Sequence, residues 1–294
     1  NHPGEIATLA AMACPTVALV NNAQREHQEF MGTVEAVARE NGSVLDFLPK
    51  DGVAIFPAGD EYTPLWTELA AGRPCLMFGE AADGAQVFAS DVVWADGAWS
   101  FALNTPQGVA AVQLHIAGRH NVRNALAAAA CAHAAGVSLA AIAKGLSGFE
   151  PVTGRSRALA VQIKGQGVTV VDDTYNANPD SVRAGIDVLA ATVGRKVLVL
   201  GDMGELGAEE KELHRNIGKA VAASGIDALF CAGTLAEEYA SEAKANPECE
   251  VHYKKTREEM TEELLAYVKE GDTVLVKASH FMEFPKVVEA LTKE

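Results

Sequence analysis

A segment with several groups able to bind a ligand follows directly on a run of β-favouring residues. The run ends at Val171, a helix is expected to begin near Pro179, and between them the sequence reads Asp172-Asp173-Thr174-Tyr175-Asn176-Ala177-Asn178. Carboxylates at the carboxyl end of a strand can accept hydrogen bonds from ribose hydroxyls or orient a metal-bound phosphate. The alternative is an Asx-rich turn that caps the following helix. Because a cap needs one such residue and this segment offers several, the pattern favours a binding loop.

A second polar loop follows the next expected strand and carries a glycine at every third position. It reads Gly201-Asp202-Met203-Gly204-Glu205-Leu206-Gly207. Glycines let a ligand approach the backbone closely. The spacing differs from the GxGxxG of dinucleotide-binding folds, so the pattern argues against a dehydrogenase. A turn that merely requires glycine is an equally good interpretation.

A third candidate opens an alanine-rich helix with Gly118-Arg119-His120-Asn121-Val122-Arg123-Asn124. Asn121 and Asn124 are three residues apart and therefore share one helix face, where their amides could read the edge of a purine. The free backbone N–H groups of the first helical turn favour an anion. A polar helix start packed between two domains explains the same residues equally well.

Two single side chains are weaker candidates on spacing alone. Arg155 follows a linker-like segment and could hold a phosphate, although such an arginine is more often solvated. His27 follows an expected strand that ends at Val20. A lone histidine of this kind is more often structural than a metal ligand.

Missing motifs and composition exclude several classes of function. The chain has no GxxxxGK[ST] phosphate loop, no GxSxG elbow and no HExxH zinc helix. Its formal net charge of −15 repels polyanions, so nucleic acid is not an expected partner. The five scattered cysteines include no CxxC, which indicates neither a zinc site nor a disulfide framework and is typical of a reducing cytosol. The longest apolar stretch, residues 125–135, is too short to span a bilayer, so membrane insertion is not expected.

The elements that position these candidates fall into two halves. A chain of 294 residues with 49% hydrophobic side chains predicts two domains, and the linker-like residues 149–154 place the boundary between residues 1–150 and 151–294. Expected strands of the first half cover residues 16–20, 53–56, 75–78, 87–95, 99–104 and 109–116. The last three form an antiparallel patch with turns at Asp96-Gly97 and Thr105–Gly108. A helix over residues 120–135 and a second helix capped by Ser138 close this half.

The second half alternates expected strands with helical patterns of about ten to fifteen residues. The strands cover residues 168–171, 196–200, 228–231 and 273–276. This alternation predicts a parallel sheet covered on both faces, with ligands beyond the carboxyl ends of the strands. We therefore also expect residues 151–294 to fold as an independent domain.

Several segments, in this order along essentially the whole chain, resemble the Mur ligase family. They are Asn1–Ile6, Asn21-Asn22 with His27, Gly118–Ala128, Gly154-Arg155, Asp172–Asn178 and Gly201–Gly207. The tyrosine–asparagine loop followed by GDMGELG is most similar to the branch that adds D-alanyl-D-alanine to UDP-N-acetylmuramoyl-tripeptide in peptidoglycan synthesis. It differs from the branches that add single amino acids and from folylpolyglutamate synthetases.

The resemblance implies an α/β fold class and a place within a larger enzyme. Mur ligases have a domain for the UDP-sugar, a central ATPase domain with a mixed sheet, and a carboxy-terminal Rossmann-like domain with a parallel sheet. By this resemblance the chain begins inside the central domain, after the phosphate loop and a magnesium-binding glutamate, so we expect no turnover from it alone. The implied enzyme is bacterial, cytoplasmic and monomeric, and uses ATP and Mg²⁺.

The implied reaction is amide formation driven by ATP. A substrate carboxylate attacks the γ-phosphorus and gives an acyl phosphate and ADP. The amine of D-alanyl-D-alanine then attacks the acyl carbon, and phosphate leaves. Phosphorylation is needed because oxide is a poor leaving group, and metal ions neutralise the charge on the transferred phosphoryl group.

The resemblance also implies roles for individual residues. In the first half, His27 would ligate Mg²⁺, and adenine would be surrounded by His120, Asn121 and Asn124. In the second half, Arg155 and Asp173 would approach phosphates and ribose, and the reacting groups would lie near Tyr175, Asn176, Asn178 and Lys277. Because Asp173 lies at the mouth of a strand, we expect its carboxylate to be exposed and to contribute little to stability.

Two positions depart from the family pattern. Many Mur ligases carry a carbamylated lysine where this chain has Asn41, after an expected helix from Gln24 to Glu40 that contains no lysine. The usual KGSR is replaced by Lys277-Ala278-Ser279-His280, which leaves the role of the arginine open. Two other functions therefore stay open: a sister ligase with another amino-acid donor, and a nucleotide- or partner-binding module without catalysis.

Overall fold

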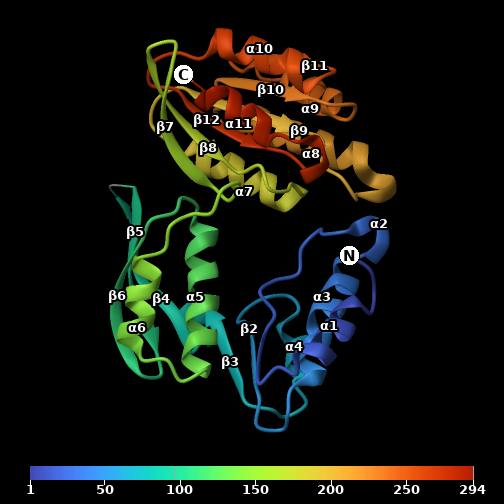
Figure 1. Cartoon of the computed structure of the whole chain (residues 1–294). Coiled ribbons are helices and arrows are strands. Elements are labelled where there is room, and N and C mark those ends of the chain that lie inside the picture. The colour runs from blue at the N-terminus through green and yellow to red at the C-terminus, as the bar shows by residue number, and fades with distance from the viewer. Residues whose placement is uncertain (96, 294) are drawn as a thin grey trace. The chain divides into compact units, whose positions relative to one another are not determined.

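The computed structural model describes residues 1–95 and 97–293, which form two compact units. Unit 1 comprises Asn1–Glu150 and unit 2 comprises Pro151–Glu294. Each unit is built on one sheet with helices packed against it, so both have the predicted α/β class (Figure 1). Within the described part of the chain, no helix is both long and apolar enough to cross a bilayer.

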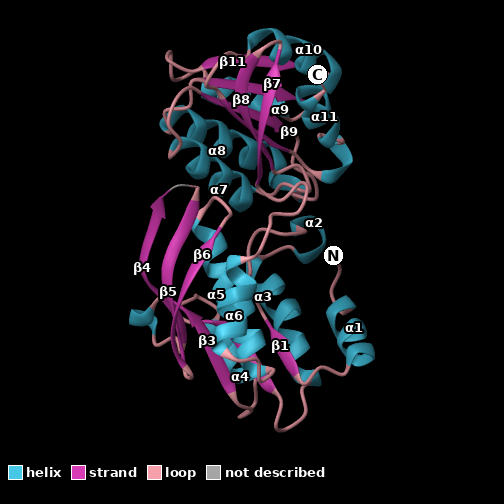
Figure 2. Ribbon diagram, turned by 60° about the vertical axis from the view of Figure 1, so that its left-hand side comes forward, coloured by secondary structure: helices cyan, strands magenta, loops and turns pink. Residues whose placement is uncertain are grey.

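The sheet of unit 1 joins a parallel part to an antiparallel part. In spatial order its strands are β1 (Val17–Leu19), β2 (Val53–Pro57), β3 (Cys75–Gly79), β4 (Val87–Ala95), β5 (Ala98–Thr105) and β6 (Gly108–Leu114). β1 to β4 are parallel neighbours, whereas β4, β5 and β6 form an antiparallel meander of longer strands (Figure 2). The predicted turn between β5 and β6 is present. The other predicted turn includes Asp96, which lies outside the described residues.

Helices cover both faces of this sheet. They are α1 (Glu5–Ala13), α2 (Gln28–Met31), α3 (Val34–Gly42), α4 (Thr63–Leu69), α5 (Arg119–Ala134) and α6 (Leu139–Ser147). The alanine-rich face of α5 packs with Ile142 of α6 against Phe78 and Leu103 of the strands. On the other face Trp66 of α4 is fully buried beside Phe56, and its indole N–H donates to the carbonyl of Ala38 in α3 at 2.9 Å. The short side chains of α5 let this helix lie close to the sheet.

The prediction of a single helix from Gln24 to Glu40 is wrong. The chain instead forms α2 and α3 as separate helices, because Gly32 adopts a φ of 74° between them. Thr33 then caps α3, with its side chain accepting a hydrogen bond from the Ala36 N–H at 3.1 Å. In the sequence, the Gly-Thr pair indicates the end of one helix and the N-cap of the next, although the helical pattern continues through it.

The sheet of unit 2 is parallel except at one edge. In spatial order its strands are β11 (Glu250–Lys254), β10 (Ala228–Ala232), β9 (Lys196–Gly201), β12 (Thr273–Lys277), β8 (Gln166–Asp172) and β7 (Arg157–Ile163). β7 forms an antiparallel hairpin with β8, and the other neighbours are parallel. The sequence patterns did not indicate β7 and β11. Most residues of β7 are exposed and most residues of β11 are half-exposed, so neither strand forms the continuous apolar run of a buried strand.

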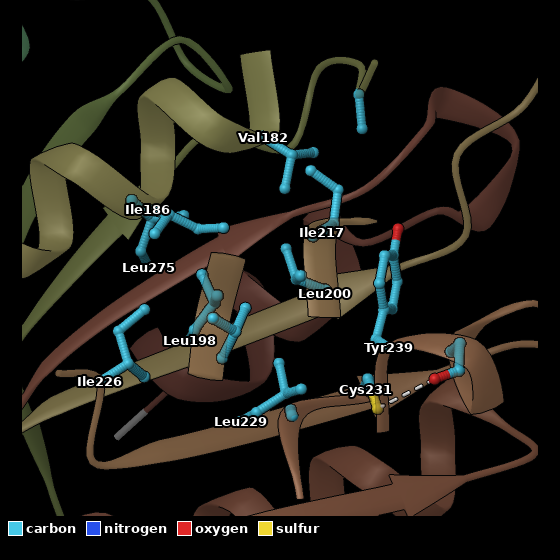
Figure 3. Close-up of a cluster of buried hydrophobic side chains, with 14 of the residues drawn as sticks. Val182, Ile186, Leu198, Leu200, Ile217, Ile226, Leu229, Cys231, Tyr239 and Leu275 are labelled. Atoms are coloured by element: carbon cyan, nitrogen blue, oxygen red, sulfur yellow. Dashed lines mark hydrogen bonds between the residues drawn. The ribbon is translucent and has the colours of Figure 1, made fainter. Parts of the chain in front are cut away.

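Helices pack on both faces of this sheet too. α7 (Pro179–Ala190), α8 (Glu210–Ala223) and α9 (Ala236–Ala243) contribute to one core cluster, and α10 (Arg257–Tyr267) and α11 (Pro285–Thr292) contribute to the other. Alternate residues of β9 point to opposite faces, with Leu198 and Leu200 in the first cluster and Val197 and Val199 in the second. Figure 3 shows side chains from α7, α8 and α9 meeting Leu198, Leu200 and Leu229 in the first cluster.

Candidate functional site

Three loops of unit 2 leave the sheet at the same edge. β12 lies between β8 and β9, and the register pairs Val276 with Asp172 and Lys277 with Leu200. Because these strands are parallel, their carboxyl ends are level. The loop after β8 continues into α7 on one face, and the segment after β12 leads to α11 on the other. Parallel sheets bind ligands where neighbouring connections part in this way.

Asp173 and Lys277 form a largely buried ion pair at this edge. The Nζ of Lys277 lies 2.6 Å from the Asp173 carboxylate and also donates to the carbonyl of Asn176 at 2.9 Å. The other Asp173 oxygen accepts from the N–H and hydroxyl of Ser156 at 3.1 and 3.2 Å. The Asp173 and Lys277 side chains are only 16% and 5% exposed. The expectation of an exposed carboxylate is therefore wrong, because neighbouring donors cover it.

Asp172 holds the loop together from the inside. Its carboxylate accepts from the Gly154 N–H at 2.9 Å and from the Thr174 hydroxyl at 2.6 Å. Gly154 has a φ of 77°, and a Cβ there would lie 3.2 Å from the Tyr175 nitrogen, so the close approach of the two segments requires glycine. Asp172 thus fixes the segment that carries Arg155 beside the loop that carries Asp173.

The amide oxygens of Asn176 and Asn178 are used locally. Asn178 is the N-cap of α7: its side chain accepts from the Ser181 N–H at 2.8 Å, and the Ser181 hydroxyl accepts from the Asn178 N–H at 3.0 Å. The side-chain oxygen of Asn176 accepts from the Ala177 N–H at 2.9 Å. The capping interpretation is therefore confirmed for Asn178, whereas the proximity of either residue to a substrate stays a prediction.

Ser279 ties the second polar loop to the first. Its hydroxyl accepts from the Gly204 N–H at 2.8 Å and donates to the carbonyl of Ala177 at 3.2 Å. In the same loop the carboxylate of Asp202 accepts from the N–H groups of Thr234 and Leu235 at 2.9 and 3.1 Å, which fixes the start of α9. We call Asp173, Lys277 and Ser279 the carboxyl-edge cluster. Its three members connect the loops after β8, β9 and β12.

An exposed cation lies next to this cluster. The guanidinium carbon of Arg155 is 3.8 Å from the centre of the Tyr175 ring, and Tyr175 is 52% exposed. The ring of His280 lies 6.1 Å from the Tyr175 ring. Stacking on an aromatic face orients a guanidinium and leaves its N–H groups available to an anion. This arrangement suits a phosphate better than an isolated surface arginine would.

Unit 1 contains a chain of asparagine amides that we call the asparagine cluster: Asn21, Asn121 and Asn124. Asn21 donates to Asn124 at 3.1 Å, Asn124 donates to Asn121 at 3.0 Å, and Asn121 donates to the carbonyl of Ala117 at 2.7 Å. His120 Nε2 lies 3.2 Å from the Asn121 side-chain nitrogen. The side-chain oxygen of Asn21 is buried without a hydrogen-bond partner among the described residues. A buried acceptor without a partner is costly, because it has lost its hydrogen bonds to water and gained none in the protein.

Asn21 was not among the predicted site residues, although it lies just past the carboxyl end of β1. A polar residue after a buried strand is the signal that could have indicated it. Asn41 supports the same loop, because its side-chain nitrogen donates to the carbonyl of Asn22 at 3.1 Å.

His27 lies farther along this loop and adopts a φ of 49° at the start of α2. Within residues 1–95 and 97–293, no group of three or more His, Cys, Asp and Glu side chains could hold a metal ion. The assignment of His27 as a magnesium ligand therefore stays a prediction.

Comparison with known protein families gives two matches that together span most of the chain. The model of the Mur ligase middle domain matches residues 1–132. The model of the Mur ligase glutamate ligase domain matches residues 155–280. These two matches contain the asparagine cluster and the carboxyl-edge cluster, respectively.

Individual relatives agree with the family models. The UDP-N-acetylmuramoyl-tripeptide–D-alanyl-D-alanine ligase of Escherichia coli is 35% identical over 99% of this chain and 63% of its own length. Among solved structures, MurF from Acinetobacter baumannii has a TM-score of 0.88 at 32% identity, covering 99% of this chain and 62% of that one. MurF from Thermotoga maritima in complex with ADP has a TM-score of 0.82 at 26% identity, covering 99% and 64%. The chain thus spans just under two thirds of the length of these relatives.

Proposed function

The chain belongs to the Mur ligase family, and we propose that it is the middle and carboxy-terminal part of a UDP-N-acetylmuramoyl-tripeptide–D-alanyl-D-alanine ligase. The observation that carries the proposal is the match to the E. coli ligase of that name, which runs through 99% of this chain at 35% identity. The complete enzyme would be an ATP-dependent ligase of peptidoglycan synthesis, acting as a monomer in the bacterial cytoplasm.

ATP would supply the phosphoryl group that makes a substrate carboxylate reactive towards the amine of D-alanyl-D-alanine. The residues of this chain would bind and orient the reactants. In unit 2, Arg155 offers a guanidinium oriented by the Tyr175 ring to a phosphate. Lys277 neutralises Asp173 and holds the carbonyl of Asn176, so the loop with Tyr175, Asn176 and Asn178 is fixed before a substrate arrives.

The asparagine cluster fits a purine. Asn121 and Asn124 lie on one face of α5, and Asn21 reaches Asn124 from the loop after β1. His120, Asn121 and Asn124 would then surround the adenine ring. For Mg²⁺ we propose only that His27 is one of its ligands, and we assign no step to the metal.

A panel of amine acceptors tests the proposed function. The full-length protein that contains this chain would be given UDP-N-acetylmuramoyl-tripeptide and ATP, and ADP release would be measured with each acceptor. We expect release with D-alanyl-D-alanine and at least a hundredfold less with D-alanine, L-alanine, D-glutamate or diaminopimelate. A preference for a single amino acid would identify a sister ligase. Nucleotide binding without release for any acceptor would indicate a binding module.

A further inference from the structure

A fully buried histidine fastens the second polar loop to α8. The Nε2 of His214 lies 3.0 Å from the N–H of Met203, and its Nδ1 lies 2.6 Å from the carbonyl of Glu210. A backbone N–H can only donate and a carbonyl can only accept. The ring must therefore be neutral, with its proton on Nδ1.

The hydrogen bond to Met203 is the first link of a chain that reaches the candidate site. The next residue, Gly204, donates its N–H to Ser279, and Ser279 donates to the carbonyl of Ala177. Ala177 lies between Asn176 and Asn178 in the loop after β8. Two consecutive N–H groups of the second loop are thus held, one by His214 and one by the carboxyl-edge cluster.

We propose that His214 is a positioning residue of the ligase site: its neutral ring holds loop 201–207 in place for Ser279, and its protonation releases that loop. The effect on catalysis rests on the proposed function, whereas the effect on the loop does not. Ser279 would then lose the donor that orients its hydroxyl toward Ala177.

The surroundings of His214 set the direction of its titration. The ring packs 4.8 Å from the Tyr239 ring, and Asp202, Glu210 and Glu238 are the nearby acidic groups. These carboxylates favour the imidazolium, but burial opposes it more strongly and lowers the pKa of His214 from its usual 6.5. In an imidazolium, Nε2 would also carry a hydrogen, so it could no longer accept from the N–H of Met203, and the two N–H groups would repel each other.

The titration of His214 makes the stability of the fold depend on pH in one direction. Because the pKa of His214 is lower in the folded than in the unfolded protein, the unfolded state binds more protons below pH 6.5. The neutral ring therefore stabilises the fold fully above that pH. The stabilisation is lost as the pH falls through the folded pKa, and the folding equilibrium constant changes by up to about tenfold per pH unit.

NMR on the whole 294-residue chain tests the loop directly. Ring nitrogen shifts of His214 should report the tautomer with hydrogen on Nδ1 at neutral pH. Amide hydrogen exchange at Met203 and Gly204 should accelerate at least tenfold, beyond the intrinsic pH effect, when His214 becomes protonated. The other tautomer, or unchanged protection of both amides through that titration, would overturn the proposal.

Two substitutions of His214 distinguish a positioning role in catalysis from a purely structural role. His214→Gln keeps an acceptor for Met203 and a donor for Glu210 but does not titrate, whereas His214→Leu keeps neither group. In the full-length enzyme we expect His214→Gln to retain kcat at pH 8 and to lose less activity than wild type below pH 6.5. His214→Leu should lower kcat at least tenfold at pH 8, where the wild-type ring is neutral, with a smaller change in KM. His115→Gln, at an exposed position, should match wild type.

Identical acid limbs for wild type and His214→Gln would contradict the proposal. If His214→Leu does not fold, the glutamine variant and the NMR titration still decide the question. If the full-length protein adds no D-alanyl-D-alanine, the proposed function fails, but the exchange of Met203 and Gly204 still tests whether His214 holds the loop.

Discussion

Polar side chains lie near strand ends in both units, but they are paired differently in the carboxyl-edge cluster of unit 2 and the asparagine cluster of unit 1. In unit 2 a largely buried carboxylate is neutralised by a buried lysine, and the contacts of Asp173 and Lys277 described above are all with other groups of the protein. In unit 1 uncharged amides form a relay that ends in a buried oxygen without a partner. The first cluster is complete without a ligand, and the second is not.

Because of this difference, we expect stability and activity to depend on the same residues in the carboxyl-edge cluster but not in the asparagine cluster. Removing one member of a buried ion pair leaves an uncompensated charge, so the carboxyl-edge cluster should not tolerate loss of either partner. An amide relay has no net charge, and deleting a group that lacks a partner costs little. Substitutions in unit 2 should therefore change both stability and turnover, whereas those in unit 1 should change nucleotide binding above all.

The largest effect is expected from Asp173→Ala. The substitution leaves Lys277 buried without its counter-ion, so we expect the free energy of unfolding to fall by about 3 kcal/mol. Turnover of the full-length enzyme should fall by orders of magnitude. Chemical denaturation and ADP release measure the two effects. Asp187→Ala is the matched control, because Asp187 is an exposed carboxylate on α7, and it should change neither quantity.

A smaller effect is expected where a glycine packs against Asp202. Gly233 has a φ of 134°, and a Cβ there would lie 2.3 Å from the Asp202 carboxylate, so Gly233→Ala must displace the group that fixes the start of α9. We expect a loss of about 2–3 kcal/mol in thermal or chemical unfolding. Gly225→Ala is the control, since Gly225 has a similar need for positive φ but open space around it. Equal losses for both variants would show that backbone strain alone is responsible.

The chemistry of the site was easier to predict from sequence than its contacts. A buried strand that runs into Asp172 and Asp173 identifies a polar loop, because a strand's end can be recognised locally. Which carboxylate meets Lys277 depends on β12 lying beside β8, and those residues are 104 positions apart in the chain. The same holds for Asn21 and Asn124, whose contact depends on the packing of α5 near β1. Edge strands such as β11 were missed because half-exposed residues give no continuous apolar signal.

In unit 1, Asn21→Ala should affect binding more than folding. The variant removes a buried oxygen without a partner together with one hydrogen bond to Asn124, so we expect the free energy of unfolding to change by less than about 1 kcal/mol. The KM for ATP of the full-length enzyme should rise about tenfold, since Asn124 of the proposed adenine site loses the hydrogen bond that Asn21 donates to it. A large loss of stability with an unchanged KM would remove the contrast between the two clusters.

The smallest effect is expected at Tyr175. Its ring orients the Arg155 guanidinium, and an exposed cation–π contact contributes about 0.5–1 kcal/mol. Tyr175→Ala should therefore raise the KM for ATP about threefold, while Tyr175→Phe, which keeps the ring, should leave it unchanged. If the phenylalanine variant is as impaired as the alanine variant, the hydroxyl rather than the ring is important.

A double-mutant cycle on Asp173 and Lys277 tests most directly whether the carboxyl-edge cluster is held by its own charges. Unfolding free energies would be measured for wild type, Asp173→Asn, Lys277→Met and the double variant. Each single variant leaves the other charge buried, and the double variant leaves none. We predict that the double variant is at least about 2 kcal/mol more stable than the sum of the two single losses implies. Additive losses would contradict this account, because they would mean that the two side chains contribute independently.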